Sequence, residues 1–143
     1  MSSNSPPVYL SEIDEEHFGI RTARVDRINI DTLPSIIDFC QANNVILLIA
    51  RCLSSDLQVV HAMEQEGFSL MDTLIYYSRN LVKSPIPTDD GKILVRPIRP
   101  GEEDKIKSIA LETFRGYSGH YHADPRLDRI KCDEAYASWA FRS

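Results

Sequence analysis

The segment from Val45 to Cys52 reads VILLIARC, a continuous aliphatic run with turn-forming residues on either side. A half-solvated strand would alternate apolar and polar residues, whereas this run gives neither of its faces to water. It is also short for a helix, and β-branched residues contribute to it. The segment therefore predicts a strand covered on both faces, which is typical of α/β proteins with helices on each side of a sheet.

Helical patterns flank this run and give the chain an alternating order. The predicted elements are a strand at 18–29, a helix at 31–44, the buried strand at 45–52, a helix at 54–67 and a strand at 69–81. The residues before 18 are polar and then acidic, and we expect a flexible start there. This order predicts an α/β fold with a parallel pair of strands at its centre. His61 falls on the apolar side of its helix and is expected in the core or at its boundary.

The clearest boundary is the stretch Val82–Lys92, which holds two prolines, two aspartates and a glycine. It divides the chain into a three-stranded N-terminal α/β region at 1–83, a linker at 84–92 and a second part at 93–143. The second part predicts a short strand at 93–98 followed by helices at 100–114 and 127–143. One strand and two helices do not close a core, so an open sheet edge is expected.

Composition narrows the function classes. The net charge of −5 argues against nucleic acid or an anionic membrane as the main partner, because both require a concentrated basic patch. The three cysteines are widely spaced and form no zinc-type pair, which favours free thiols in a reducing cytosol. The N-terminal residues MSSNSPP do not resemble a signal peptide, and VILLIA is too short to cross a bilayer. We therefore expect a cytoplasmic protein.

The stretch SGHYHADPRLD concentrates chemistry-bearing residues and has several interpretations. His120, His122 and Asp124 alternate as metal ligands can, although a catalytic zinc site needs three converging ligands and an open position. Alternatively, Asp124 caps a helix whose first residue is Pro125. His120, Tyr121 and His122 then form an exposed ledge before that helix, and the two histidines either bind a substrate or are merely solvated.

Two longer stretches resemble a known family. ILVRPIRPGEEDKIKSIALETF is similar to the first strand and first helix of a GNAT (Gcn5-related N-acetyltransferase) domain, and FRGYSGHYHADPRLDRIKCDEAYASWAFRS resembles the helix-loop-helix of dTDP-fucosamine acetyltransferase-type enzymes. The resemblance implies acyl transfer from acetyl-CoA to an amino group, such as that of a nucleotide-linked amino sugar. It also implies that Tyr117, His120, Tyr121 and His122 line the acceptor pocket, with His120 or His122 relaying a proton.

The chain departs from the family pattern in the motif that binds the cofactor. The GNAT acetyl-CoA site is a Q/R-x-x-G-x-G/A turn at a helix N-terminus, and none of the six glycines gives that spacing. We therefore expect the N-terminal part of such a domain, with no cofactor-binding or metal-binding residues, that does not bind acetyl-CoA tightly and is inactive alone. Two alternatives remain: a non-catalytic α/β module that self-associates or pairs with another chain, and a metal-dependent hydrolase using His120, His122 and Asp124.

Overall fold

The protein is described from a computed structural model that covers residues 7–86, 91 and 94–142. It divides into two compact units, Met1–Leu70 and Met71–Ser143, called here the first and second units. The chain is of the mixed α/β class, as the sequence predicts. The predicted 84–92 linker falls inside the second unit, and its residues 87–90 and 92 lie outside the described residues.

A three-stranded sheet organises the first unit. Its strands are β1 (Val8–Leu10), β2 (Thr22–Val25) and β3 (Leu47–Ala50), in the order β1-β2-β3. β1 is antiparallel to β2, whereas β2 and β3 are parallel, with Thr22 opposite Leu47. The predicted parallel pair is therefore confirmed, and the VILLIARC run supplies one of its two strands.

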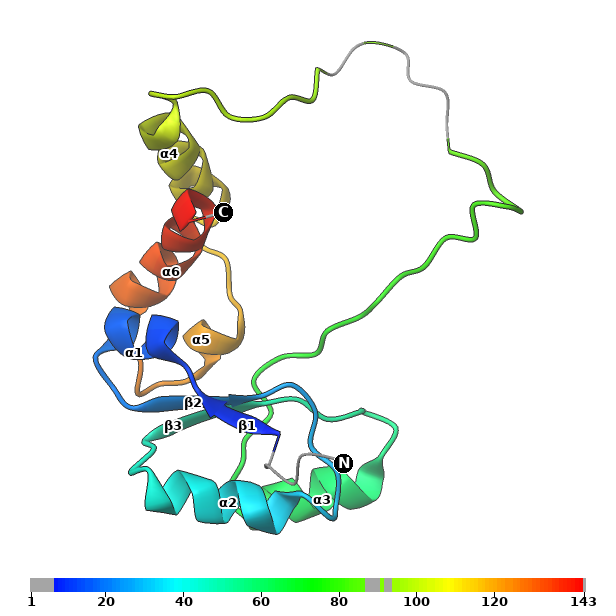
Figure 1. Ribbon diagram of the computed structural model, residues 1–143, viewed down its shortest axis with the longest axis vertical. Helices are drawn as coiled ribbons and strands as arrows, with labels where there is room; N and C mark the ends of the chain where they lie inside the picture. Colours follow the sequence, from blue (N-terminus) through cyan, green and yellow to red (C-terminus); the bar gives the residue numbers. More distant parts are fainter. Residues whose placement is uncertain (1–6, 87–90, 92–93, 143) are drawn as a thin grey trace, which may run out of the picture. The chain divides into compact units, whose positions relative to one another are not determined.

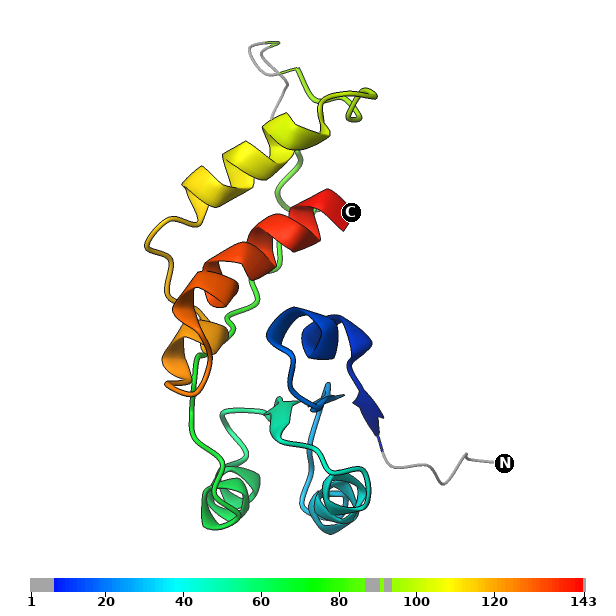
Figure 2. The same ribbon diagram turned by 90° about the vertical axis from the view of Figure 1, so that its left-hand side faces the viewer.

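Three helices flank this sheet. α2 (Leu33–Ala42) and α3 (Leu57–Gln65) lie on one side of it, and α1 (Glu12–Phe18) lies on the other (Figures 1 and 2). α2 has Pro34 in its first turn, and α3 is capped by Asp56, whose carboxylate accepts the Val59 N–H at 3.4 Å. Ile36 of α2 and Val59 of α3 are buried with Val25 of the sheet. Apolar residues at helical spacing thus meet an apolar sheet face.

A buried ion pair joins α1 to the sheet. Asp14 is only 2% exposed, and its carboxylate accepts hydrogen bonds from the Ser11 hydroxyl and from the Arg24 guanidinium in a bidentate arrangement. Arg24 lies in β2, so the pair connects α1 to the central strand. Glu15 pairs with Arg21 near the surface, where the single nitrogen Nη1 lies 3.1 and 3.2 Å from the two carboxylate oxygens. The Asp14 pair is both bidentate and more buried, so removing one of its partners should cost more.

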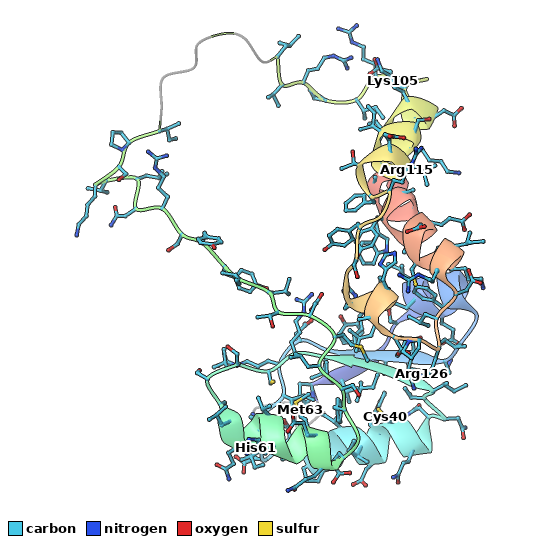
Figure 3. The ribbon with its side chains drawn as sticks, turned by 180° about the vertical axis from the view of Figure 1, so that it is seen from behind. Cys40, His61, Met63, Lys105, Arg115 and Arg126 are labelled. Carbon is cyan, nitrogen blue, oxygen red and sulfur yellow. The ribbon has the colours of Figure 1, made fainter. Side chains whose placement is uncertain are left out.

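Several predicted strand and helix positions are wrong. The expected flexible start contains β1 and α1 from Val8 onward, and the predicted 18–29 strand is reduced to β2. The 69–81 segment is extended but forms no strand with any described residue, and the same holds for residues 94–98; Ile93 lies outside the described residues. His61 is exposed on α3, where Figure 3 labels it beside Met63, and is therefore not a core residue.

Three helices lie in the described part of the second unit. They are α4 (Glu103–Thr113), α5 (His120–Ala123) and α6 (Arg129–Arg142), and α4 and α6 run antiparallel side by side (Figure 2). Their buried residues include Ala110, Cys132 and Ala135, while Ile109 and Ile130, which the helical pattern placed on the apolar faces, are 57% and 70% exposed. In the described part of the chain, none of the helices combines the length and apolar character needed to cross a bilayer.

Glu102, which precedes α4, is held by two arginines. Both of its oxygens accept hydrogen bonds from Arg96 at 2.8 Å, and one accepts the Arg99 backbone N–H at 3.0 Å. The Arg96 hydrogen bonds and then the Arg99 N–H lower the pKa of Glu102 from 4.5 to about 2. A depressed carboxyl pKa favours the folded turn above pH 4.5, and this contribution disappears as pH falls toward 2.

We therefore predict that Glu102 titrates with a midpoint near 2 when its carboxyl carbon is followed by NMR. Arg96→Gln should move that midpoint upward toward 4.5, because the strongest interaction with the carboxylate is removed. Lys105→Gln is the matched control: Lys105 acts only through charge and most weakly, so its removal should change the midpoint much less. Equal shifts in the two variants would contradict the assigned role of Arg96.

Candidate functional site

An aromatic cluster connects the three helices of the second unit. It consists of six rings from the end of α4, the following turn, α5 and α6: Phe114, Tyr117, Tyr121, His122, Tyr136 and Trp139. Tyr136 is central, because its ring stacks on Phe114 at 4.5 Å and meets Tyr117 edge-on at 5.2 Å. Such contacts fix the orientation of α5 against α6.

Tyr136 is held as a neutral phenol. Burial, followed by the neighbouring Tyr117 and Asp72, raises the pKa of Tyr136 to about 12. Gly119 allows the close approach of these rings, since a Cβ at this position would lie 2.6 Å from the Tyr136 hydroxyl and 2.7 Å from Cε1 of Tyr117. Within this cluster Tyr117 is 46% exposed, so it is the tyrosine that presents surface to a ligand.

Tyr121 and His122 do not form the exposed ledge that the sequence predicts. The stretch forms a single helical turn, α5, and this turn directs both side chains inward: Tyr121 is 1% exposed and His122 is 7% exposed. His122 Nδ1 accepts the Gly119 N–H at 3.4 Å, and Nε2 lies 3.0 Å from the Asp133 carboxylate. The neutral imidazole therefore carries its proton on Nε2 and connects the start of α5 to α6. Both residues support the fold rather than contact a substrate.

His120 is differently placed: its side chain is partly exposed, although its Nε2 atom is buried. Its Nδ1 lies 3.4 Å from the carboxylate of Asp72, and the two side chains are 24% and 38% exposed. Its ring is tilted against Tyr121, with 4.1 Å between centroids, which limits its rotation. Asp72 comes from the extended segment at the beginning of the second unit, far from His120 in sequence. No motif pointed to it, since the pattern placed it within a predicted strand.

Asp124 does not cap α6. It follows the last residue of α5, and its carboxylate accepts hydrogen bonds from the side chain and backbone N–H of Arg126, which Figure 3 labels in the turn before α6. These bonds, the side-chain one first, lower the pKa of the Asp124 carboxyl. The cap of α6 is instead Asp128, whose Oδ1 accepts the Lys131 N–H at 3.0 Å. The predicted helix start is therefore displaced by one turn.

Each of the three residues proposed as metal ligands pairs with a different protein side chain. His120 faces Asp72, His122 faces Asp133 and Asp124 is paired with Arg126. Across the residues that the structure describes, no three histidine, cysteine, aspartate or glutamate side chains converge as metal ligands would. The arrangement therefore disagrees with the sequence hypothesis of a metal-dependent hydrolase.

The starts of α4 and α5 do not fit the pyrophosphate of acetyl-CoA. α4 begins with Glu102, Glu103 and Asp104, whose negative charge opposes a phosphate. At α5 the Gly119 N–H is used by His122, and the space beside this glycine is filled by Tyr136 and Tyr117. These residues therefore cannot supply the phosphate cradle that a GNAT cofactor requires.

The structure thus brings two candidate residues, Tyr117 and His120, to the surface of the aromatic cluster and buries the other two, Tyr121 and His122. It adds Asp72 as the partner of His120. Comparisons of the whole chain with protein-family models, with curated proteins and with solved structures gave no match.

Proposed function

We propose that the second unit forms the acceptor-binding side of a GNAT-type N-acyltransferase, in which His120 and Asp72 receive the amino group to be acylated. The observation that carries the proposal is the 3.4 Å approach of His120 Nδ1 to the Asp72 carboxylate, with both side chains partly exposed. A histidine paired with a carboxylate is the usual arrangement of a general base. The sequence resemblance supplies the reaction class.

The chemistry assigned to this pair is removal of a proton from the acceptor. An amine is protonated at neutral pH and must lose a proton before it can act as a nucleophile. With its Nδ1 proton directed at Asp72, the neutral imidazole has its lone pair on Nε2. This atom is buried in the structure, so the proposal requires α5 to open locally before the acceptor ammonium reaches it. The carboxylate of Asp72 then stabilises the imidazolium that forms, and it keeps the ring oriented while the proton is transferred.

The acceptor proposed is a nucleotide-linked amino sugar. Tyr117 provides an exposed aromatic face and a hydroxyl, which suit a sugar ring and its hydroxyl groups. Because the starts of α4 and α5 give the acyl donor no phosphate cradle, the proposal concerns the acceptor side, and we predict no tight binding of acetyl-CoA to this chain.

The test is a titration of the full chain with a dTDP-linked amino deoxysugar. Binding is monitored through the amide signals of Gly119 to Ala123 in NMR spectra. We predict saturable shifts in these signals, weakened roughly ten-fold or more in His120→Ala and in Asp72→Asn, because a charge-assisted contact to the ammonium group is lost. The same sugar nucleotide with its amino group already acetylated should bind more weakly, since it carries no positive charge.

His61→Ala is the matched control, because His61 is an exposed histidine of the first unit. It should bind the sugar nucleotide like the parent protein. Circular dichroism of each variant establishes that the fold is retained. The proposal fails if the parent protein shows no shifts, if His61→Ala weakens binding as much as His120→Ala does, or if the acetylated ligand binds equally well.

A further inference from the structure

A surface hollow of about 370 Å³ lies between α2 and α3 in the first unit. Its wall comes from the first turns of α2, the chain just before them and the end of α3, and it is mostly apolar: Ile30, Leu33, Pro34, Ile37 and Ala62. Leu33 is buried and Ile30 is 38% exposed, so the wall continues from the core to the surface. Small-molecule sites have volumes of roughly 300–1,000 Å³ and mainly apolar walls with a few polar groups. This α2/α3 hollow has the size and lining of such a site.

Two carboxylates are the charged groups of the α2/α3 hollow. They belong to Asp38 of α2 and to Glu66, which follows the last residue of α3. Both residues are exposed, and neither side chain makes a hydrogen bond or an ion pair with another described residue. The described residues that line the hollow include no lysine, arginine or histidine. Both negative charges are therefore available to a ligand.

The charge around the hollow has one sign. The ranges 31–42 and 56–66, which hold α2 and α3 with the residues beside them, contain neither lysine nor arginine but five acidic residues: Asp31, Asp38, Asp56, Glu64 and Glu66. The side chains of the first unit include ten acidic and four basic residues, which gives a net charge of −6. A negative potential raises the local concentration of cations and disfavours anions. Charge complementarity therefore selects a cation as the ligand of an otherwise apolar wall.

We propose that the α2/α3 hollow binds a small primary amine with a linear aliphatic chain, whose ammonium group pairs with Asp38 and Glu66. The hydrocarbon chain lies on the apolar wall and gains free energy by leaving water. The ammonium group has three N–H donors for the two carboxylates. Lysine side chains divide in the same way, with the stem on apolar surface and the charged head in water. The hollow belongs to the first unit, so this site is separate from the proposed acceptor site.

The test is an NMR titration of the full chain with hexylamine, monitored through the methyl signals of Ile37 and Ala62. Hexylamine is a cation at pH 7, as the lysine side chain is. We predict saturable shifts with a Kd of roughly 1 mM, which is typical of a ligand with so few heavy atoms. Added sodium chloride should weaken this binding, because it screens charges near the surface.

Two matched ligands separate the contribution of charge from that of the apolar chain. Hexanol has the same chain without a charge and should bind roughly three-fold or more weakly than hexylamine. Hexanoate has the opposite charge and should give no saturable shifts. Asp38→Asn and Glu66→Gln should each weaken hexylamine binding roughly two- to five-fold, the range for an exposed ion pair, and leave hexanol binding unchanged.

Glu64→Gln is the matched control, because it makes the same charge change on α3 at a residue that does not line the hollow. It should weaken hexylamine binding much less than Glu66→Gln does. Asp72→Asn should leave the Ile37 and Ala62 shifts unchanged, since Asp72 belongs to the proposed acceptor site. The proposal is overturned if hexylamine gives no saturable shifts, if hexanol or hexanoate binds as tightly, or if Glu64→Gln and Glu66→Gln have equal effects.

Discussion

Tyr121→Ala is expected to lower the free energy of unfolding of the second unit by about 3–4 kcal/mol, the range for a large buried aromatic side chain. Tyr121 is 1% exposed, and its ring lies 5.8 Å from that of Trp139 and 6.4 Å from that of Tyr136. Alanine would leave a cavity between α5 and α6. Urea denaturation followed by fluorescence measures the loss directly, because Trp139 is the single tryptophan of the chain and reports on this unit.

Tyr117→Ala is the control for this experiment. Tyr117 belongs to the same cluster but is 46% exposed, so its removal should cost about 1 kcal/mol. The comparison separates a structural role of the tyrosines from a substrate-binding role, which the sequence could not distinguish. If Tyr121→Ala were as stable as the parent and only ligand binding changed, Tyr121 would be a substrate residue after all.

The local patterns of the first unit were sufficient to predict its parallel pair. The VILLIARC run and the helices around it specify β3, α2 and α3 through short-range periodicity. β1 is different, because three residues carry too little pattern to predict a strand. Its conformation follows from pairing with β2, where Val8 lies opposite Val25. A contact between segments of this kind is not contained in either segment alone.

The 69–81 segment shows the opposite case. Its residues have the pattern of a strand, and the backbone is extended, but no described segment pairs with it. Periodicity predicts which side chains share a face, whereas a strand also requires a partner that supplies hydrogen bonds.

The candidate site was predicted in part. The sequence predicts an exposed ledge of His120, Tyr121 and His122, and the structure leaves only the side chain of His120 partly exposed. The alternation of His120 and His122 suggested an extended chain, but one helical turn separates their directions and buries His122. Asp72 could not be predicted, because its approach to His120 depends on how a distant segment returns to α5.

The ion pair between Asp14 and Arg24 should give the second large effect. Asp14→Ala is predicted to destabilise the first unit by about 2–4 kcal/mol, because it leaves the guanidinium of Arg24 partly buried without its carboxylate. The lower limit of this range applies if the Arg24 guanidinium, whose side chain is 21% exposed, is rehydrated by water after Asp14 is removed. Hydrogen exchange of the Ala23 and Arg24 amides in β2 measures the change as a free energy of opening.

Glu15→Ala supplies a matched control one residue along α1. Glu15 and Arg21 also form a pair, but only one guanidinium nitrogen, Nη1, contacts the Glu15 carboxylate. Their side chains are 35% and 41% exposed, so the loss should stay below about 1 kcal/mol. A double-mutant cycle with Arg24→Ala sharpens the comparison. Arg24→Ala alone should lower the free energy of unfolding at least as much as Asp14→Ala does, because it leaves the Asp14 carboxylate, only 2% exposed, without its guanidinium partner. The double variant should cost less than the two single changes added together, because neither charge is then left alone. Strict additivity would mean that the two side chains stabilise the first unit independently, and the pair would then not be what holds α1 to β2.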